Sequence, residues 1–241
     1  MASIKRKPRK NLGPLNLSDE PLETPDTVSC LIHLRLLDAF EKLKSRTGLK
    51  DGLWDIWDNR ASSADNSLDI LVKLREKRWA VYVARAVDRY QAWWESFRPV
   101  MLLQSDMFPG SATTEKYTQF LNSEPISWRE EDLPPLDVLM VWHAHMLSPR
   151  VYLEDCLRYG HGPLWAAGMP WKLVRAALQE KSDFSFTVGA DCVESWEKRT
   201  GRDWENALDP LEKEMRCPSC GAELRIPWTT CGLPQEYDGD R

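Results

Sequence analysis

The feature that most constrains the fold is a run of large apolar residues between positions 79 and 97, which recurs at the 3.6-residue period of an α-helix. One face carries Trp79, Tyr82, Val83, Ala86, Tyr90, Trp93, Trp94 and Phe97. Arg78, Arg85, Asp88, Arg89 and Glu95 mark the other face, which we expect to face solvent. A groove of stacked aromatic rings could bind a ligand, but the spacing alone favours packing of this helix against other helices.

The rest of the chain also has mostly helical patterns, so we predict a mainly α fold, a multi-helical bundle. A first helix is expected from Asp26 to Gly48, and another after Ser63 or Asp65. Pro134-Pro135 opens a helix that reaches Met146, and Ser148-Pro149 opens one that ends at Gly160. Shorter helices are expected at 114–121, 171–178 and 191–199, with a loop or short helix at 51–60 and a short strand at 222–228.

The composition indicates an ordinary globular protein rather than a membrane or disulfide-rich one. The chain has 241 residues, 42% of them hydrophobic and 29% charged, with a formal net charge of −5. This charge argues against a general nucleic-acid binder, and no apolar run approaches the ~20 residues that span a bilayer. Six cysteines, mostly far apart, predict a reducing compartment, the cytosol or the nucleus.

The chain divides into three parts by composition. Residues 1–25 form a basic, proline-containing tail with a cluster from Lys5 to Lys10, which is either a solubilising disordered arm or a nuclear localisation or anionic-surface signal. Residues 26–210 are expected to form the helical domain. Residues 211–241 are expected to form a small Cys-containing, ribbon-like C-terminal piece.

The helix that begins at Pro135 carries the side chains best suited to binding or catalysis, in the segment Trp142-His143-Ala144-His145. It is apolar nearly all round, which places it centrally. His143 and His145 are two positions apart, roughly 200° on a helix, so they point to different sides. A helical zinc pair needs histidines at positions i and i+4, so this spacing is weak evidence for a metal.

The next helix offers hydrogen-bonding partners for these histidines. Tyr152, Asp155, Cys156 and Tyr159 share one of its faces, and the tight corner at Ser148 could fold that face back. Asp155 or Tyr152 would then bond a His ring nitrogen. The candidate site residues are His143, His145, Asp137, Asp155 and Tyr152. They form either a buried structural network or a binding or catalytic site. Neither a nucleophile elbow for Ser-His-Asp hydrolysis nor a Gly-rich phosphate loop is present.

The pattern Asp137-x4-Trp142-His143-x-His145-x-Leu147-x-Pro149-x2-Tyr152-x2-Asp155-Cys156 resembles the signature of the glycine-rich domain-containing protein-like family of plants and fungi. The segment from Lys77 to Trp94 is similar too, and the likeness covers about residues 26–230, nearest to fungal members. The resemblance implies little about activity: plant relatives are linked with growth and stress responses, and some carry RNA-binding or glycine-rich extensions that this chain lacks. Some fungal relatives bear an oxygenase label, which this chain does not support, because it has no His-x-Asp motif and an all-α chain is not a jelly-roll barrel.

Cys217-Pro-Ser-Cys220-Gly221 has the form of a zinc knuckle, since two thiolates two residues apart can bracket one metal. A structural zinc needs four ligands, and only half a site is visible. Fungal relatives continue with another Cys pair, so this chain looks cut short or its ribbon has degenerated. Cys231 is the first candidate for a further ligand, and Cys192 or His161 could join only if the fold brings them near. Free thiols are an equal alternative, and a redox pair a lesser one.

Three functions compete on these observations. The preferred hypothesis is a non-enzymatic helical interaction or regulatory protein, with a protein partner and a structural Trp-His-x-His motif. The alternative is a metal-dependent, oxygenase- or hydrolase-like enzyme that uses His143 and His145 with Asp137 or Asp155. A nuclear factor that combines the basic tail with a zinc ribbon is the third.

Overall fold

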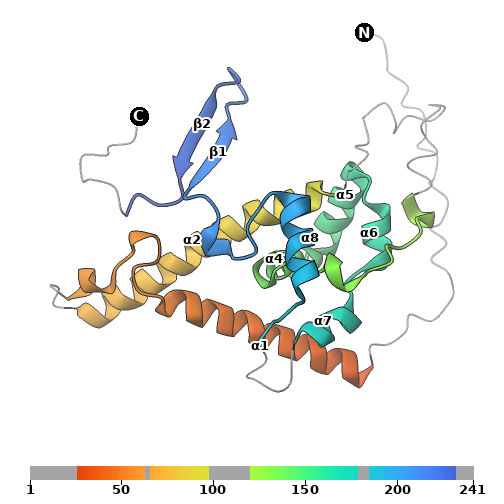
Figure 1. Ribbon diagram of the computed structural model, residues 1–241, viewed down its shortest axis with the longest axis horizontal. Helices are drawn as coiled ribbons and strands as arrows, with labels where there is room; N and C mark the ends of the chain where they lie inside the picture. Colours follow the sequence, from red (N-terminus) through yellow and green to blue (C-terminus); the bar gives the residue numbers. More distant parts are fainter. Residues whose placement is uncertain (1–25, 63–65, 98–119, 179–184, 232–241) are drawn as a thin grey trace, which may run out of the picture.

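Two long helices, α1 (Thr27–Leu49) and α2 (Ser67–Glu95), pack against each other and support the shorter helices (Figure 1). The computed structural model describes residues 26–62, 66–97, 120–178 and 185–231. The predicted tail (1–25), Pro99 and nearly all of the predicted helix at 114–121 lie outside these ranges. The mainly helical fold with a small Cys-bearing end is confirmed.

Local sequence signals explain where most helices begin and end. The Asp26 carboxylate accepts a hydrogen bond from the Ser29 amide at 2.6 Å and so caps α1. Pro149 occupies the first turn of α5, and Gly160 ends this helix with φ of 70°. The shorter helices are α4 (Leu136–Met146), α5 (Pro149–Tyr159), α6 (Gly162–Ala167), α7 (Trp171–Ala177) and α8 (Ala190–Thr200). Single 3₁₀ turns lie at Leu53–Asp55, Asp58–Ala61, Phe120–Asn122, Glu130–Asp132 and Asn206–Leu208.

Helix α2 corrects two expectations. It is continuous from Ser67, where two successive helices were expected, and its first turns are exposed, with Leu68 at 75% and Val72 at 57%. The expectation that three of its arginines face solvent is wrong, because Arg78, Arg85 and Arg89 are 0%, 1% and 1% exposed.

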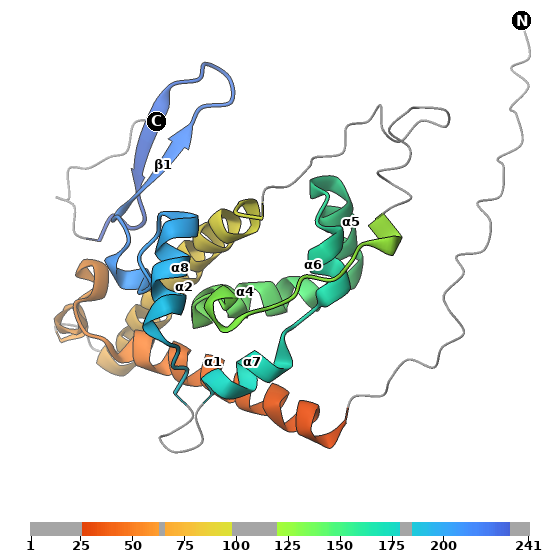
Figure 2. The same cartoon turned by 45° about the vertical axis from the view of Figure 1, so that its right-hand side comes forward.

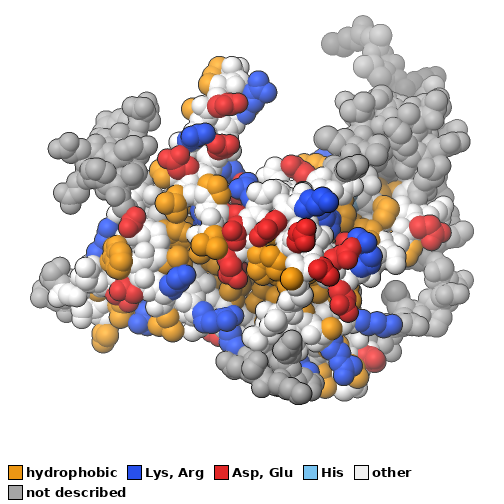
Figure 3. Space-filling view, in the orientation of Figure 1, with side chains coloured by type: hydrophobic (Ala, Val, Ile, Leu, Met, Phe, Trp, Pro, Cys, Tyr) orange, Lys and Arg blue, Asp and Glu red, His pale blue; other side chains and the backbone are white. Residues whose placement is uncertain are grey.

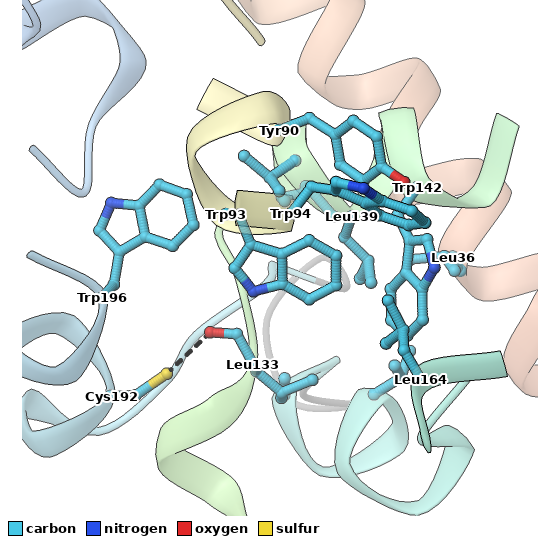
Figure 4. Close-up of a cluster of buried hydrophobic side chains, with 14 of the residues drawn as sticks. Leu36, Tyr90, Trp93, Trp94, Leu133, Leu139, Trp142, Leu164, Cys192 and Trp196 are labelled. Carbon is cyan, nitrogen blue, oxygen red and sulfur yellow. Dashed lines mark hydrogen bonds between the residues drawn. The ribbon is translucent and has the colours of Figure 1, made fainter. Parts of the chain in front are cut away.

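A layer of aromatic rings from α2 and α4 forms the centre of the core (Figure 4). The Trp93 and Trp142 rings lie 5.0 Å apart, and both side chains are almost fully buried. Residues of α1, α6 and α8 close this cluster, including Leu36, Leu164 and Trp196. Helix α4 contacts α1, α2 and α5 and lies in the middle of the helices (Figure 2), which confirms its predicted central position.

The last described elements are β1 (Glu212–Arg216) and β2 (Glu223–Pro227), an antiparallel hairpin that projects from the helices (Figures 1 and 2). At its base, Lys213 pairs with Asp88 of α2 at 3.2 Å. The strand near 222–228 was predicted, whereas β1 was not. Met215 pairs with Leu224 and Lys213 with Ile226, so these four side chains share one face of the hairpin. Charged and hydrophobic side chains both lie on its surface (Figure 3). Within the described ranges, no helix is apolar enough over a sufficient length to cross a bilayer.

Candidate functional site

The two histidines of α4 face different sides of the helix, as their spacing predicts. His143 points to α1, where its Nε2 atom lies 2.8 Å from Nε2 of His33. One neutral ring donates this hydrogen bond and the other accepts it. Burial and the neighbouring His33 lower the pKa of His143. His33 lies 110 positions earlier in the chain, and the sequence analysis did not identify it.

His145 points to α2 and α5, where it links a tyrosine to a carboxylate. Its Nδ1 atom lies 2.8 Å from the Tyr90 hydroxyl, and its Nε2 atom lies 3.3 Å from Oδ2 of Asp155. Burial raises the pKa of Tyr90 well above its ordinary value, so this hydroxyl stays protonated and donates a hydrogen bond to Nδ1 of His145. Nε2–H then donates to Asp155. Burial lowers the pKa of His145 although Asp155 opposes the shift. The predicted His–Asp pair is therefore present.

Tyr152 of α5 also contacts α4, and its ring lies 5.0 Å from that of His145. Its hydroxyl accepts a hydrogen bond from Nε1 of Trp142 at 3.2 Å. Burial raises the pKa of Tyr152, and it raises the pKa of the Cys156 thiol beside it to about 12. Neither group can ionise near neutral pH, so neither is an activated nucleophile.

Asp137 belongs to a different network, on the side of α4 that faces α2 and the 3₁₀ turn at 206–208. Its Oδ2 atom accepts hydrogen bonds from Nε of Arg89 and Nδ2 of Asn206, both at 2.8 Å. Arg89 also bonds Oδ2 of Asp209 at 2.5 Å and the carbonyl oxygens of residues 203 and 204. One arginine is thus paired with two buried carboxylates.

The other two buried arginines of α2 bond mainly to backbone carbonyl oxygens. Arg78 donates to the carbonyl oxygens of Gly48 and Ile56, both at 2.6 Å, and pairs with Asp58. Arg85 donates to the carbonyl oxygens of Asn206, Asp209 and Pro210 at 2.7–2.8 Å. A guanidinium group offers five donors, enough to satisfy several carbonyls of an irregular loop at once. These arginines therefore attach the loops at 48–58 and 203–210 to α2.

Five cavities among the described residues lie away from the histidines of α4. Their volumes are about 190–670 Å³, and none of the five is lined by His143, His145, Tyr152 or Asp155. Asp137 contributes to one of about 270 Å³, together with Tyr82, Arg46 and Lys50. None of these five cavities therefore brings the candidate residues together where a substrate could meet them.

The structure separates the candidate zinc ligands. Cys217 and Cys220 lie in the turn of the hairpin, whereas Cys231 lies past the other end of β2, where its carbonyl oxygen accepts a hydrogen bond from Arg60 at 2.6 Å. Cys192 is buried against the carbonyl oxygen of Leu133. In the ranges that the structure describes, no three His, Cys, Asp or Glu side chains form a group that could hold a metal.

His161 is a further buried histidine and makes the fold sensitive to acid. It is 3% exposed, and its ring lies 4.5 Å from that of Trp94. Burial lowers its pKa from 6.5 to about 4. The unfolded chain therefore binds a proton at this residue near pH 6.5, whereas the folded protein does not until about pH 4. Its contribution to stability is complete above pH 6.5 and is lost as the pH falls toward 4.

We expect the free energy of unfolding to fall between pH 7 and pH 4, with His161 accounting for about 3 kcal/mol at ~1.4 kcal/mol per pKa unit. Urea unfolding at pH 7, 6, 5 and 4 measures this slope. The control is His161→Phe, which keeps a ring in the aromatic cluster but cannot bind a proton, so its stability should fall less with pH. An equal slope in both proteins would exclude His161 as the cause.

The chain was compared with known proteins on three levels. No family profile, no curated protein and no solved structure matches it. The arrangement of its own residues is therefore the basis for a functional conclusion.

Proposed function

We propose that this protein is a non-catalytic helical interaction protein in which the Trp-His-x-His motif has a structural role. One observation carries the proposal: side chains of the motif bond polar side chains of α1, α2 and α5 at buried or partly buried positions between the helices. His143 bonds His33, His145 bonds Tyr90 and Asp155, and the Trp142 indole bonds Tyr152. Hydrogen bonds between side chains of different helices fix the relative positions of those helices, which is a structural role.

The hairpin supplies the surface for interaction. Met215, Leu224 and Ile226 are 44–45% exposed on one of its faces. An isolated two-stranded hairpin is marginally stable in water, and its two edges are open to further pairing. A partner that covers this apolar face would stabilise it.

The alternative, an oxygenase- or hydrolase-like metal enzyme, needs His143 and His145 at one point. Their partners lie on α1 in one case and on α2 and α5 in the other, so the geometry favours the structural role. On the motif from Asp137 to Cys156, we also propose membership of the glycine-rich domain-containing protein-like family. All six cysteines are free, which accords with the proposed cytosolic or nuclear compartment.

The test compares metal content and stability in two double variants. We expect His143→Ala/His145→Ala to lose about 1–3 kcal/mol of unfolding free energy per residue, because His33, Tyr90 and Asp155 are left without their partners. Its metal content, measured by inorganic mass spectrometry, should equal that of the wild type. The matched control is Cys217→Ser/Cys220→Ser, a double variant outside the core whose metal content and stability are measured in the same way. Stoichiometric metal that disappears with the histidines, while circular dichroism shows the helices intact, would contradict the proposal.

A further inference from the structure

The turn of the hairpin holds two thiols at the spacing of half a tetrathiolate metal site. The Cys217 amide donates to the carbonyl oxygen of Ala222, and the Gly221 amide donates to the carbonyl oxygen of Cys217, both at 2.8 Å. Gly221 has φ of 74°, which suits glycine. Cys217 and Cys220 therefore lie two residues apart in one tight, hydrogen-bonded turn, as the paired thiolates of a zinc knuckle do.

The other thiols and imidazoles of the described chain cannot complete this site in the folded protein. Cys156, Cys192, His143 and His161 are buried among the helices. His33 and His145 are bonded within the helical body, and Cys30 lies on α1. Cys231 follows the end of β2 opposite the turn, and a five-residue strand spans about 17 Å.

A second copy of this chain would supply what is missing. A two-fold axis through the metal brings an identical Cys217–Cys220 pair from the other copy, which completes four tetrahedral sulfur ligands. On the same hairpin, Met215 pairs with Leu224 below the turn, and Ile226 lies further along this face beside Lys213, which pairs with Asp88 of α2 at 3.2 Å. A two-fold pair of hairpins would bury both copies of this face. The opposite face carries charged side chains, among them Arg225, which pairs with Glu214 at 3.0 Å.

We propose that two copies of this protein dimerise through their hairpins by sharing one zinc ion, held by Cys217 and Cys220 of each copy. Four thiols bind one Zn²⁺ and release four protons, which gives a Zn(S-Cys)₄ centre of charge −2 without oxidation or reduction. This proposal rests on the proposed function, because it names the partner of the interaction protein as a second copy. A metal held by the histidines would contradict the non-catalytic function and would leave the zinc-linked dimer untouched.

The experiment uses the full chain, stripped of metal by a chelator under reducing conditions and then titrated with Zn²⁺. We expect binding to saturate at half a zinc ion per chain while light scattering after gel filtration shows the mass doubling from the 27.9 kDa of one chain. Cys217→Ser/Cys220→Ser should abolish both changes, and Cys231→Ser should keep both. Leu224→Glu, which leaves every thiol in place, should weaken the zinc-dependent dimer at least tenfold.

Several outcomes would overturn the proposal. One zinc per chain in a monomer would mean that the remaining ligands come from within the chain or from solvent. No zinc bound at micromolar concentration would leave the thiols free. A dimer that forms only under oxidation, without metal, would be a disulfide-linked species. In each case the variant of His143 and His145 still tests the proposed function independently.

Discussion

Replacing Arg89 with methionine is expected to lower the free energy of unfolding by about 3–5 kcal/mol, the largest single effect of a charge in this protein. The side chain is 1% exposed, and its guanidinium group is paired with Asp137 and Asp209, which are 2% and 7% exposed. Methionine preserves much of the volume but leaves two carboxylates buried without their cation. Urea unfolding followed by circular dichroism measures the change.

Two further variants separate charge from packing. Arg89→Met/Asp137→Asn removes one of the stranded carboxylates and should recover part of the lost stability, because the Asn206 side chain can still bond the new amide oxygen. Lys73→Met is the control, since Lys73 is exposed on the same helix and should change stability by no more than about 0.5 kcal/mol. Equal losses for Arg89→Met and Lys73→Met would show that the buried ion pairs contribute nothing.

The boundaries of α1 and α5 could be predicted because their signals are local. Asp26, Pro149 and Gly160 act within one turn of the residues they cap or end, so the sequence near them is sufficient. The opposed directions of His143 and His145 follow from helical periodicity in the same way. The pairing of His145 with Asp155 was also accessible, because only a short corner separates their helices.

The burial of Arg78, Arg85 and Arg89 could not be predicted from polarity, because their partners are distant in sequence. The loop carbonyls that Arg85 and Arg89 bond lie more than 110 positions further along the chain. A helical projection did contain a signal: Arg89 lies only about 40° from Trp93, by 100° per residue, so it borders the apolar face. The His33–His143 pair was missed for the same reason of distance.

The hairpin was only half predicted for a different reason. β1 reads Glu-Lys-Glu-Met-Arg and has no alternation of apolar and polar residues that would indicate a strand. β2 contains Leu224 and Ile226 at alternate positions, which is the pattern that indicated a strand.

Replacing Trp142 with alanine is the other change of large expected effect, with a loss of about 3–5 kcal/mol of unfolding free energy. Trp142 is 0% exposed, and its ring lies 5.0 Å from that of Trp93 and 5.6 Å from that of Trp128. Alanine leaves a cavity at the centre of α4 and removes the donor to the Tyr152 hydroxyl. The same urea measurement applies.

Trp142→Phe divides this effect into its parts, since phenylalanine keeps most of the ring packing and loses the indole N–H, so its loss should be clearly smaller. Trp57→Ala removes an equally large side chain that is 45% exposed, and we expect it to change stability by about 1 kcal/mol or less. If Trp142→Ala were no more destabilising than Trp57→Ala, the motif helix would not be the centre of the core. The structural role proposed for Trp-His-x-His would then lose its physical basis, because the side-chain network would not hold the helices in place.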